Sequence, residues 1–285
     1  DLGNLKEAEI STRRAIDIQP NFSNANYNLG KILSYLGNSK EAEKYTRKAI
    51  KQKPNYTFAY SNLGIILKDL GKLKEAEVSI RKAIEIKPDF LQANINLATT
   101  LRQLGKHEEA KLSLLEAIRL KPDFAELHLN LGNILTDLGK SAEAEVSIRK
   151  AIKLKPNLVN AHITLGVILN DLGKYKDAEI SYNKAISLKP DSNSALINRW
   201  QLFFDNGNYE AALKDIDRLD TQVSRACALE TLFALGRIDE IHKRIKKTSN
   251  TDYGNIRMAA FCSFLAQKNK KDTGHQFCQN PLSFL

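Results

Sequence analysis

The leucines of this chain recur on one face of a helix, and the whole stripe repeats every 34 residues. The first two stripes are Leu29, Leu33 and Leu36, then Leu63, Leu67 and Leu70. Apolar residues at this spacing predict an amphipathic helix over Asn24 to Leu36, and the next segment predicts a second helix over Ser39 to Gln52. One such hairpin cannot bury its stripe alone, so we expect consecutive hairpins to stack into an all-α solenoid.

Glycine and proline keep the same period and mark the ends of the two helices. The glycines are Gly3, Gly37, Gly71, Gly105, Gly139, Gly173 and Gly207. The prolines are Pro20, Pro54, Pro88, Pro122, Pro156 and Pro190. Gly37 follows the apolar end of the first helix and can take the left-handed conformation that closes a helix C-terminus. Pro54 has no amide hydrogen and disfavours a helical residue before it, so it marks the end of the second helix.

Together with small residues in both helices, these positions resemble the tetratricopeptide repeat (TPR). The matching segments of one unit are Ala-Asn-Tyr-Asn-Leu-Gly at 25–30, Leu-Gly at 36–37, Glu-Ala at 41–42, Lys-Ala-Ile at 48–50, and Pro54. The small residues indicate where two helix backbones approach closely. The resemblance implies a TPR solenoid of antiparallel helical hairpins forming a right-handed superhelix. It also implies a concave face, lined by the first helices, that holds peptides or partner helices.

The regularity of the repeat divides the chain into three parts. Residues 1–192 are predicted to form a regular array whose first unit is truncated, residues 193–268 a degenerate helical cap, and residues 269–285 a tail or the start of a further domain. In the cap, Trp200 replaces the small residue and Leu235-Gly236 arrives 29 residues after Gly207 instead of 34. The helices predicted there cover Ser224 to Leu235, Ile238 to Lys247 and Tyr253 to Lys268.

A polar row recurs on successive first helices and is the candidate binding site. It comprises Asn28, Asn62, Asn96, Asn130, Thr164 and Asn198. A carboxamide both donates and accepts, so such a row can hydrogen-bond the backbone of an extended peptide without reading its sequence. It resembles the asparagine ladder of the O-linked N-acetylglucosamine transferases. The alternative is that these side chains only bond neighbouring repeats. The aspartate ladder of those enzymes has no equivalent, since the corresponding residues are Asn24, Phe58, Gln92, Glu126, Asn160 and Ser194.

The charge and the reactive residues point away from other functions. The net charge is +10, but most basic residues fall on second helices, outside the predicted groove and without interleaved aromatic side chains. We therefore expect no nucleic-acid partner. His128 and His162 stand one repeat apart, too far for zinc, and are expected to pack. The sequence contains no motif for catalysis or for binding a metal or cofactor. The three cysteines are odd in number and lack metal-ligand spacing, which favours a reducing cytoplasm. No apolar stretch is long enough to span a membrane, so we expect no membrane partner.

The sequence thus favours a scaffold without catalytic residues that binds a peptide or partner protein. An alternative is a substrate-delivery array of a larger enzyme, either a glycosyltransferase or a 2-oxoglutarate and Fe(II) dependent oxygenase. Residues 266–285 resemble the junction in bacterial TPR proteins fused to such an oxygenase domain. We accordingly expect the chain to be an internal part of a longer protein that continues past Leu285. Weak self-association is a further possibility.

Overall fold

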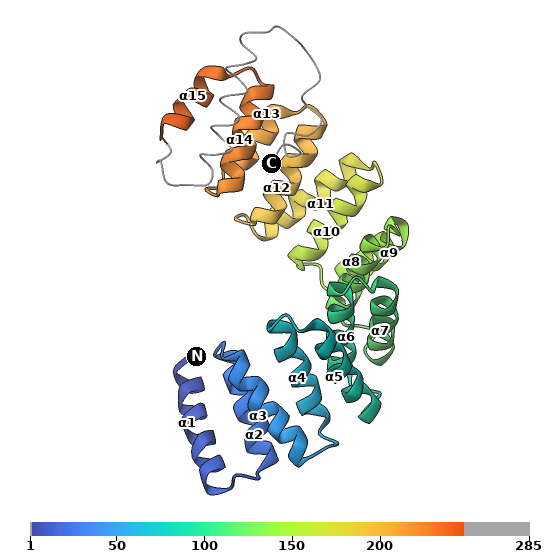
Figure 1. Cartoon of the computed structure of the whole chain (residues 1–285). Coiled ribbons are helices and arrows are strands. Elements are labelled where there is room, and N and C mark those ends of the chain that lie inside the picture. Colours follow the sequence, from blue (N-terminus) through green and yellow to red (C-terminus); the bar gives the residue numbers. More distant parts are fainter. Residues whose placement is uncertain (1, 248–285) are drawn as a thin grey trace. The chain divides into compact units, whose positions relative to one another are not determined.

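The computed structural model describes residues 2–247, which form fifteen α-helices and no strand (Figure 1). The first helices of the repeats are α2 (Ser23–Tyr35), α4 (Thr57–Asp69), α6 (Leu91–Gln103), α8 (Ala125–Asp137), α10 (Val159–Asp171), α12 (Asn193–Asp205) and α14 (Gln222–Ala234). The second helices are α1 (Leu2–Ile18), α3 (Ser39–Gln52), α5 (Leu73–Ile86), α7 (His107–Leu120), α9 (Ser141–Leu154), α11 (Tyr175–Leu188), α13 (Tyr209–Ile216) and α15 (Ile238–Lys247).

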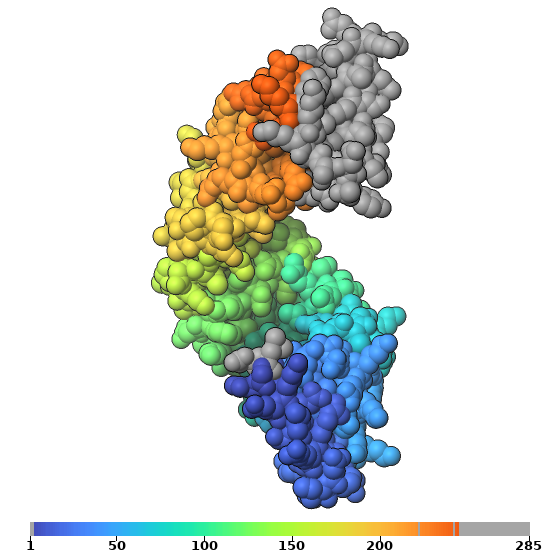
Figure 2. Space-filling model, turned by 90° about the vertical axis from the view of Figure 1, so that its left-hand side faces the viewer, coloured from blue at the N-terminus to red at the C-terminus, as the bar shows by residue number. Residues whose placement is uncertain are grey.

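The helices belong to two compact units, Asp1–Ala178 and Glu179–Leu285. In the first unit α2, α4, α6 and α8 each pack most extensively on the second helix that follows, and then on the second helix before, while α10 packs on α9 before it. The hairpins therefore follow one another in sequence order, as the successive bands of colour show in Figure 2. This confirms the all-α solenoid and the helix boundaries predicted for one unit to within one residue.

The glycine at each hairpin turn adopts the predicted left-handed conformation. Gly37 has φ 80° and its N–H donates to the carbonyl of Ser34 at 3.1 Å, while the N–H of Asn38 reaches the carbonyl of Leu33 at 2.8 Å. Two of the carbonyls left free at the end of α2 are thereby satisfied. Gly3 differs, because it lies inside the continuous helix α1. No first helix precedes it in the part of the chain that the structure describes, and the turn expected there is not formed.

The glycines inside the first helices permit close contact with the second helix of the same hairpin. A Cβ atom on Gly64 would lie 2.3 Å from Cγ1 of Ile80, and one on Gly132 would lie 2.3 Å from Cδ1 of Ile148. These separations are far inside van der Waals contact, so only glycine fits without movement of its neighbour. The small-residue prediction is confirmed at these positions.

Four of the proline loops are held by a hydrogen bond from a side chain six residues further on to the proline carbonyl. In each case a side-chain nitrogen donates to the proline carbonyl: Asn26 to Pro20, Asn94 to Pro88, His128 to Pro122 and His162 to Pro156. The two histidines are buried and each donates from Nε2, at 2.7 and 2.8 Å. The structural role expected for His128 and His162 is confirmed, and the bond explains why either an amide or an imidazole serves at this position.

The first unit curves toward its first helices. The Cα atoms of α2 and α4, of α4 and α6, and of α8 and α10 come within 8 Å of each other, whereas consecutive second helices in the described residues do not contact one another to this degree. A stack whose first helices lie closer together than its second helices must be concave on the first-helix side. The first helices therefore form the inner face, as the resemblance implied.

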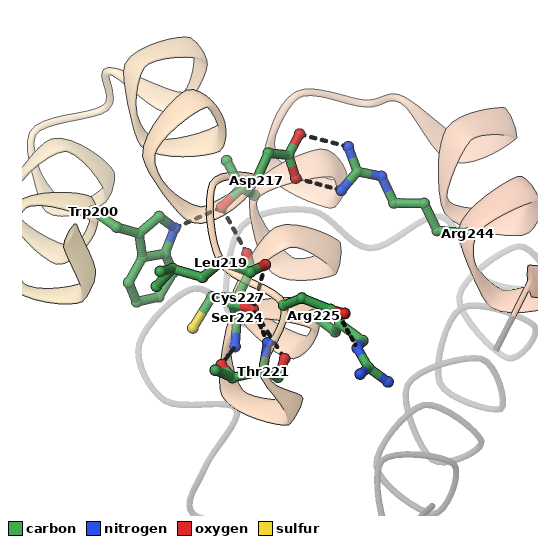
Figure 3. Close-up of polar contacts among 10 residues, drawn as sticks. Trp200, Asp217, Leu219, Thr221, Ser224, Arg225, Cys227 and Arg244 are labelled. Carbon is green, nitrogen blue, oxygen red and sulfur yellow. Dashed lines mark hydrogen bonds and ion pairs between the residues drawn. The ribbon is translucent and has the colours of Figure 1, made fainter. Parts of the chain in front are cut away.

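The second unit departs from the repeat around Trp200. Its indole N–H donates to Oγ1 of Thr231 at 2.8 Å, and Thr231 donates to the carbonyl of Cys227 at 2.7 Å. Trp200 lies in one apolar cluster with residues of α13, α14 and α15, among them Cys227, whose side chain Figure 3 shows close by. Burial, together with the nearby charge of Glu230, raises the pKa of the Cys227 thiol to about 12. This thiol is accordingly unreactive at neutral pH.

The shortened connection in the second unit is stabilised by its own polar contacts. Thr221 and Ser224 form a reciprocal capping box at the start of α14, and Asp217 pairs with both terminal nitrogens of Arg244 (Figure 3). The helix that the sequence predicts over Ser224 to Leu235 is observed as α14, and the one over Ile238 to Lys247 as α15. The helix predicted over Tyr253 to Lys268 and the tail at 269–285 lie outside the described residues.

Candidate functional site

The inner face of the first unit carries four side chains from each first helix. On α4 they are Phe58, Asn62, Ile65 and Asp69, spaced by three or four residues so that they share one side of the helix. The equivalent positions of α2, α6, α8 and α10 repeat this arrangement. We call these side chains together the first-helix face. Its central members are Asn28, Asn62, Asn96, Asn130 and Thr164, which form the amide row.

Three members of the amide row bond to the scaffold. Asn96 is only 8% exposed, accepts from Gln92 at 3.1 Å and donates to Ser61 of the preceding repeat at 3.4 Å. Asn62 reaches Oγ1 of Thr46 at 3.5 Å. Thr164 donates to Oδ1 of Asn133 at 3.3 Å. These contacts match the alternative interpretation of the row, in which its side chains only bond neighbouring parts of the scaffold.

Asn28 and Asn130 differ from the other members. Within residues 2–247 neither side chain forms a hydrogen bond, and Asn28 is exposed while Asn130 is half-buried. Their amides therefore keep both donor and acceptor capacity for a ligand. Asn198 is half-buried on α12 of the second unit and is not counted in the row.

The C-terminal edge of the first-helix face is acidic. Asp69, Asp137 and Asp171 are the last residues of α4, α8 and α10. A carboxylate at this end of a helix opposes the helix dipole, which favours cations there. Asp137 is neutralised by the guanidinium of Arg102, which donates from both Nε and Nη2, and Nδ1 of His107 lies 3.6 Å away.

The N-terminal edge is aromatic in the second repeat. Phe58 is 51% exposed, and its ring meets that of Phe90 edge-on with centroids 5.3 Å apart. An exposed aromatic side chain beside amide groups offers apolar contact area. The sequence placed Phe58 where the resembled transferases carry an aspartate, and only its packing shows that it partners Phe90.

The outer face carries ion pairs that the sequence analysis missed. Arginines of one second helix donate to glutamates of the next: Arg13 to Glu41, Arg47 to Glu75 and Arg81 to Glu109. Lysines that precede a second helix form ion pairs with glutamates of the second helix before it: Lys72 with Glu43, Lys106 with Glu77 and Lys174 with Glu145. The recurrence of Glu and Arg every 34 residues could have indicated these ion pairs. Which charges meet, however, depends on how the repeats stack.

Ion pairing on this face also changes the titration of its carboxylates. Hydrogen bonds from Lys111 and Lys140 lower the pKa of Glu108 to about 2. A hydrogen bond from Lys72, opposed by partial burial and aided by Arg47, lowers the pKa of Glu43. Much of the basic charge on these helices is thus matched by a neighbouring carboxylate within the chain.

Other kinds of site were sought in the described residues. No three His, Cys, Asp or Glu side chains of residues 2–247 are grouped as a metal site would require. None of the helices described in this range has the length and apolar content needed to cross a bilayer.

Comparison with known families gives a consistent result along the array. Two models described as "Tetratricopeptide repeat" match the chain, one at residues 23–56, 125–158 and 159–192 and the other at residues 57–90, and a model described as "TPR repeat" matches residues 98–139. Together these segments cover more than half of the chain. Comparison with curated proteins gave no significant match.

Solved structures of similar fold span most of the described helices. A tetratricopeptide repeat protein from Parabacteroides merdae has a TM-score of 0.65 and 20% identity over 82% of this chain and 96% of its own. The pilF protein of Pseudomonas aeruginosa has a TM-score of 0.61 and 23% identity, covering 69% and 90%. YrrB, described as a TPR protein with an unusual peptide-binding site, has a TM-score of 0.55 and 23% identity. The match covers 65% of this chain and 95% of YrrB. At such identities the likeness concerns the fold.

Proposed function

Since the chain belongs to the tetratricopeptide-repeat family, whose fold implies a protein-interaction scaffold, we propose that its first-helix face binds an extended peptide segment of a partner protein. The observation that carries this proposal is the amide row, in which Asn28 and Asn130 have free hydrogen-bonding groups. The described peptide-binding site of YrrB, a protein of the same fold, supports the same use of such an array.

The spacing of the free amides suits an extended chain. Asn28 and Asn130 are three repeats apart, and helices pack at about 10 Å, so about 30 Å separates them along the stack. An extended peptide rises about 3.3 Å per residue, so about nine residues span this distance. Each amide can donate to a peptide carbonyl and accept from a peptide N–H, which gives affinity with little dependence on sequence.

The experiment is a selection of random dodecapeptides on the full chain, followed by affinity measurements on the selected peptides by fluorescence anisotropy. Replacing Asn28 and Asn130 together by alanine should weaken binding at least tenfold, since each lost hydrogen bond contributes about 0.5–1.5 kcal/mol. The matched control replaces Asn55 and Asn157, exposed amides of the proline loops, and should leave affinity unchanged.

Asn96 provides a second comparison. Because it bonds Gln92 and Ser61, Asn96→Ala should lower the free energy of unfolding, and circular dichroism in urea would report this. If no peptide is selected, or if the Asn28 and Asn130 variant binds the selected peptides as well as the parent does, the proposal is wrong. In that case the amide row serves only the scaffold.

A further inference from the structure

Three first helices of the first unit end in aspartate, and only one of these carboxylates has a cation beside it in the described part of the chain. Arg102 holds Asp137 with two nitrogens, and it stands 35 residues earlier, at the end of the preceding first helix. The corresponding residue is Ser34 for Asp69 and Thr136 for Asp171. Within residues 2–247, Asp69 and Asp171 form no ion pair, and both are exposed.

The Arg102 contact shows what this position can bind. A guanidinium matches a carboxylate with two parallel hydrogen bonds, which are shorter and stronger than neutral ones. At Asp69 and Asp171 the same carboxylate, at the same end of the same kind of helix, lacks that partner among the described residues. Each also opposes the helix dipole, so an added cation would relieve an unfavourable local interaction.

Building on the proposed peptide-binding function, we propose that the ligand is an extended peptide carrying two basic side chains about nine residues apart. One side chain would pair with Asp69 and the other with Asp171. These residues are three repeats apart, or about 30 Å along the stack, which about nine extended residues span. Arg102 already fills the position at Asp137, so a third basic residue about six positions after the first has no free carboxylate.

Charge complementarity selects this occupant over an acidic one. The free groups at this edge of the first-helix face are carboxylates, whereas glutamates of the outer face are matched by arginines and lysines of the chain. The whole chain carries a net charge of +10, which disfavours a basic peptide at long range. Substitution at the two aspartates is therefore a cleaner test than salt dependence, which would combine both effects.

The first experiment uses peptides that bind the parent chain in the dodecapeptide selection. Selected sequences should be enriched in Arg or Lys at two positions about nine apart. Replacing both basic residues by glutamine should weaken binding about tenfold, and Asp69→Asn with Asp171→Asn should weaken the dibasic peptide equally. The same double variant should bind the glutamine peptide as the parent does.

The second experiment tests the assignment through gain of binding. Arg102→Gln frees Asp137, so a peptide with a third arginine about six positions after the first should bind this variant about threefold more tightly than the dibasic peptide. The parent chain should not distinguish the two peptides. Arg119→Gln, which removes an exposed arginine of α7, is the matched control and should behave as the parent.

The outcomes separate this inference from the function on which it rests. If no peptide binds at all, the peptide-binding function fails, and with it the inference. If peptides bind through Asn28 and Asn130 but show no preference for basic residues, or if the Asp69 and Asp171 variant is indistinguishable from the parent toward dibasic peptides, only the inference is overturned.

Discussion

Nη2 of Arg47 lies 2.8 Å from Oε2 of Glu75, a residue of the next second helix. Arg47 also holds Glu43 of its own helix, so one guanidinium joins two consecutive repeats. The same arrangement recurs at Arg13 and Arg81. Stability in a solenoid depends on such interfaces between neighbours. The outer face therefore contributes to the stability of the array, in addition to the apolar stripe.

Glu43 should be more important for stability than an ordinary surface glutamate. Its side chain is 15% exposed and accepts from both Arg47 and Lys72. Glu43→Gln should lower the free energy of unfolding by about 1–2 kcal/mol, because hydrogen bonds to charged groups contribute more than neutral ones. Glu85→Gln is the control, since Glu85 is 68% exposed and pairs with Lys82 of its own helix. Equal urea midpoints for the two variants would contradict this role.

The array should lose stability in acid. The pKa values of Glu43 and Glu145 are lowered, each chiefly by a hydrogen bond from a lysine, and that of Glu108 falls to about 2. A carboxylate with a lowered folded pKa stabilises the fold above its unfolded pKa, about 4.3, and this contribution is lost as pH falls through the folded value. Thermal midpoints should thus fall between about pH 4.5 and pH 2.

The partly buried carboxylate of Glu230 acts in the opposite direction. Burial raises the pKa of Glu230, so its protonation favours the folded state as pH falls. The carboxylates whose pKa is lowered outnumber Glu230, so the array should lose stability on balance as pH falls. A thermal midpoint that stays constant from about pH 7 to about pH 2.5 would refute the assigned ion pairs.

Leu97 tests the division between the buried and exposed sides of the helices. It is 4% exposed on α6, so Leu97→Ala should cost about 2–5 kcal/mol. Lys82→Ala, on the outer face of α5, should change the free energy of unfolding by less than about 0.5 kcal/mol. Chemical denaturation followed by circular dichroism measures both. Similar losses would mean that the faces are assigned wrongly.

The contact between Gly132 and Ile148 can be tested by a double-mutant cycle. Gly132→Ala places a methyl group against Ile148 and should destabilise the array by about 1–3 kcal/mol. Ile148→Ala removes both Cδ1 and Cγ1, which lie 2.3 and 2.5 Å from the added carbon. The double variant should therefore lose less than the sum of the two single variants, and strict additivity would argue against a direct clash.

Local chemistry explains why the hairpins could be predicted from sequence. Gly37, Pro54 and the leucine stripe each act within one turn of helix, so their spacing defined α2 and α3 to within one residue. Gly3 was harder to predict, since this periodic glycine lies within α1 and forms no turn. The identity of a residue is not enough where the described residues contain no preceding first helix to give it a role.

Contacts between repeats were beyond the sequence pattern. Asn96 and Asn130 hold the same repeat position, yet of the two only Asn96 is hydrogen-bonded among the described residues, to Gln92 of its own helix and to the hydroxyl of Ser61 in the preceding repeat. The residue that corresponds to Ser61 for Asn130 is Ile95, whose side chain has no polar atom. The two amides thus differ because of residues that lie four and 35 positions before them, since Glu126 stands where Gln92 donates to Asn96.

The last proline loop of the array is likewise held in its own way. Leu196 stands where four of the other repeats place the amide or imidazole that bonds the proline carbonyl, and its side chain cannot donate. Arg218 donates to the carbonyl of Pro190 instead, at 2.7 Å. This donor comes from the end of the following hairpin, so the 34-residue pattern gave no indication of it.

The 34-residue spacing of the outer ion pairs makes the repeat at residues 57–90 replaceable by the repeat that follows it. If residues 57–90 were excised, Glu109 would take the position of Glu75 beside Arg47, and Lys106 would take that of Lys72 beside Glu43. This new junction would meet the same chemistry as the old one. The array could therefore shorten by this 34-residue unit without leaving Glu43 or Arg47 unmatched, whereas α7, which carries Lys111 and Leu115 at the equivalent positions, could not form the same junction.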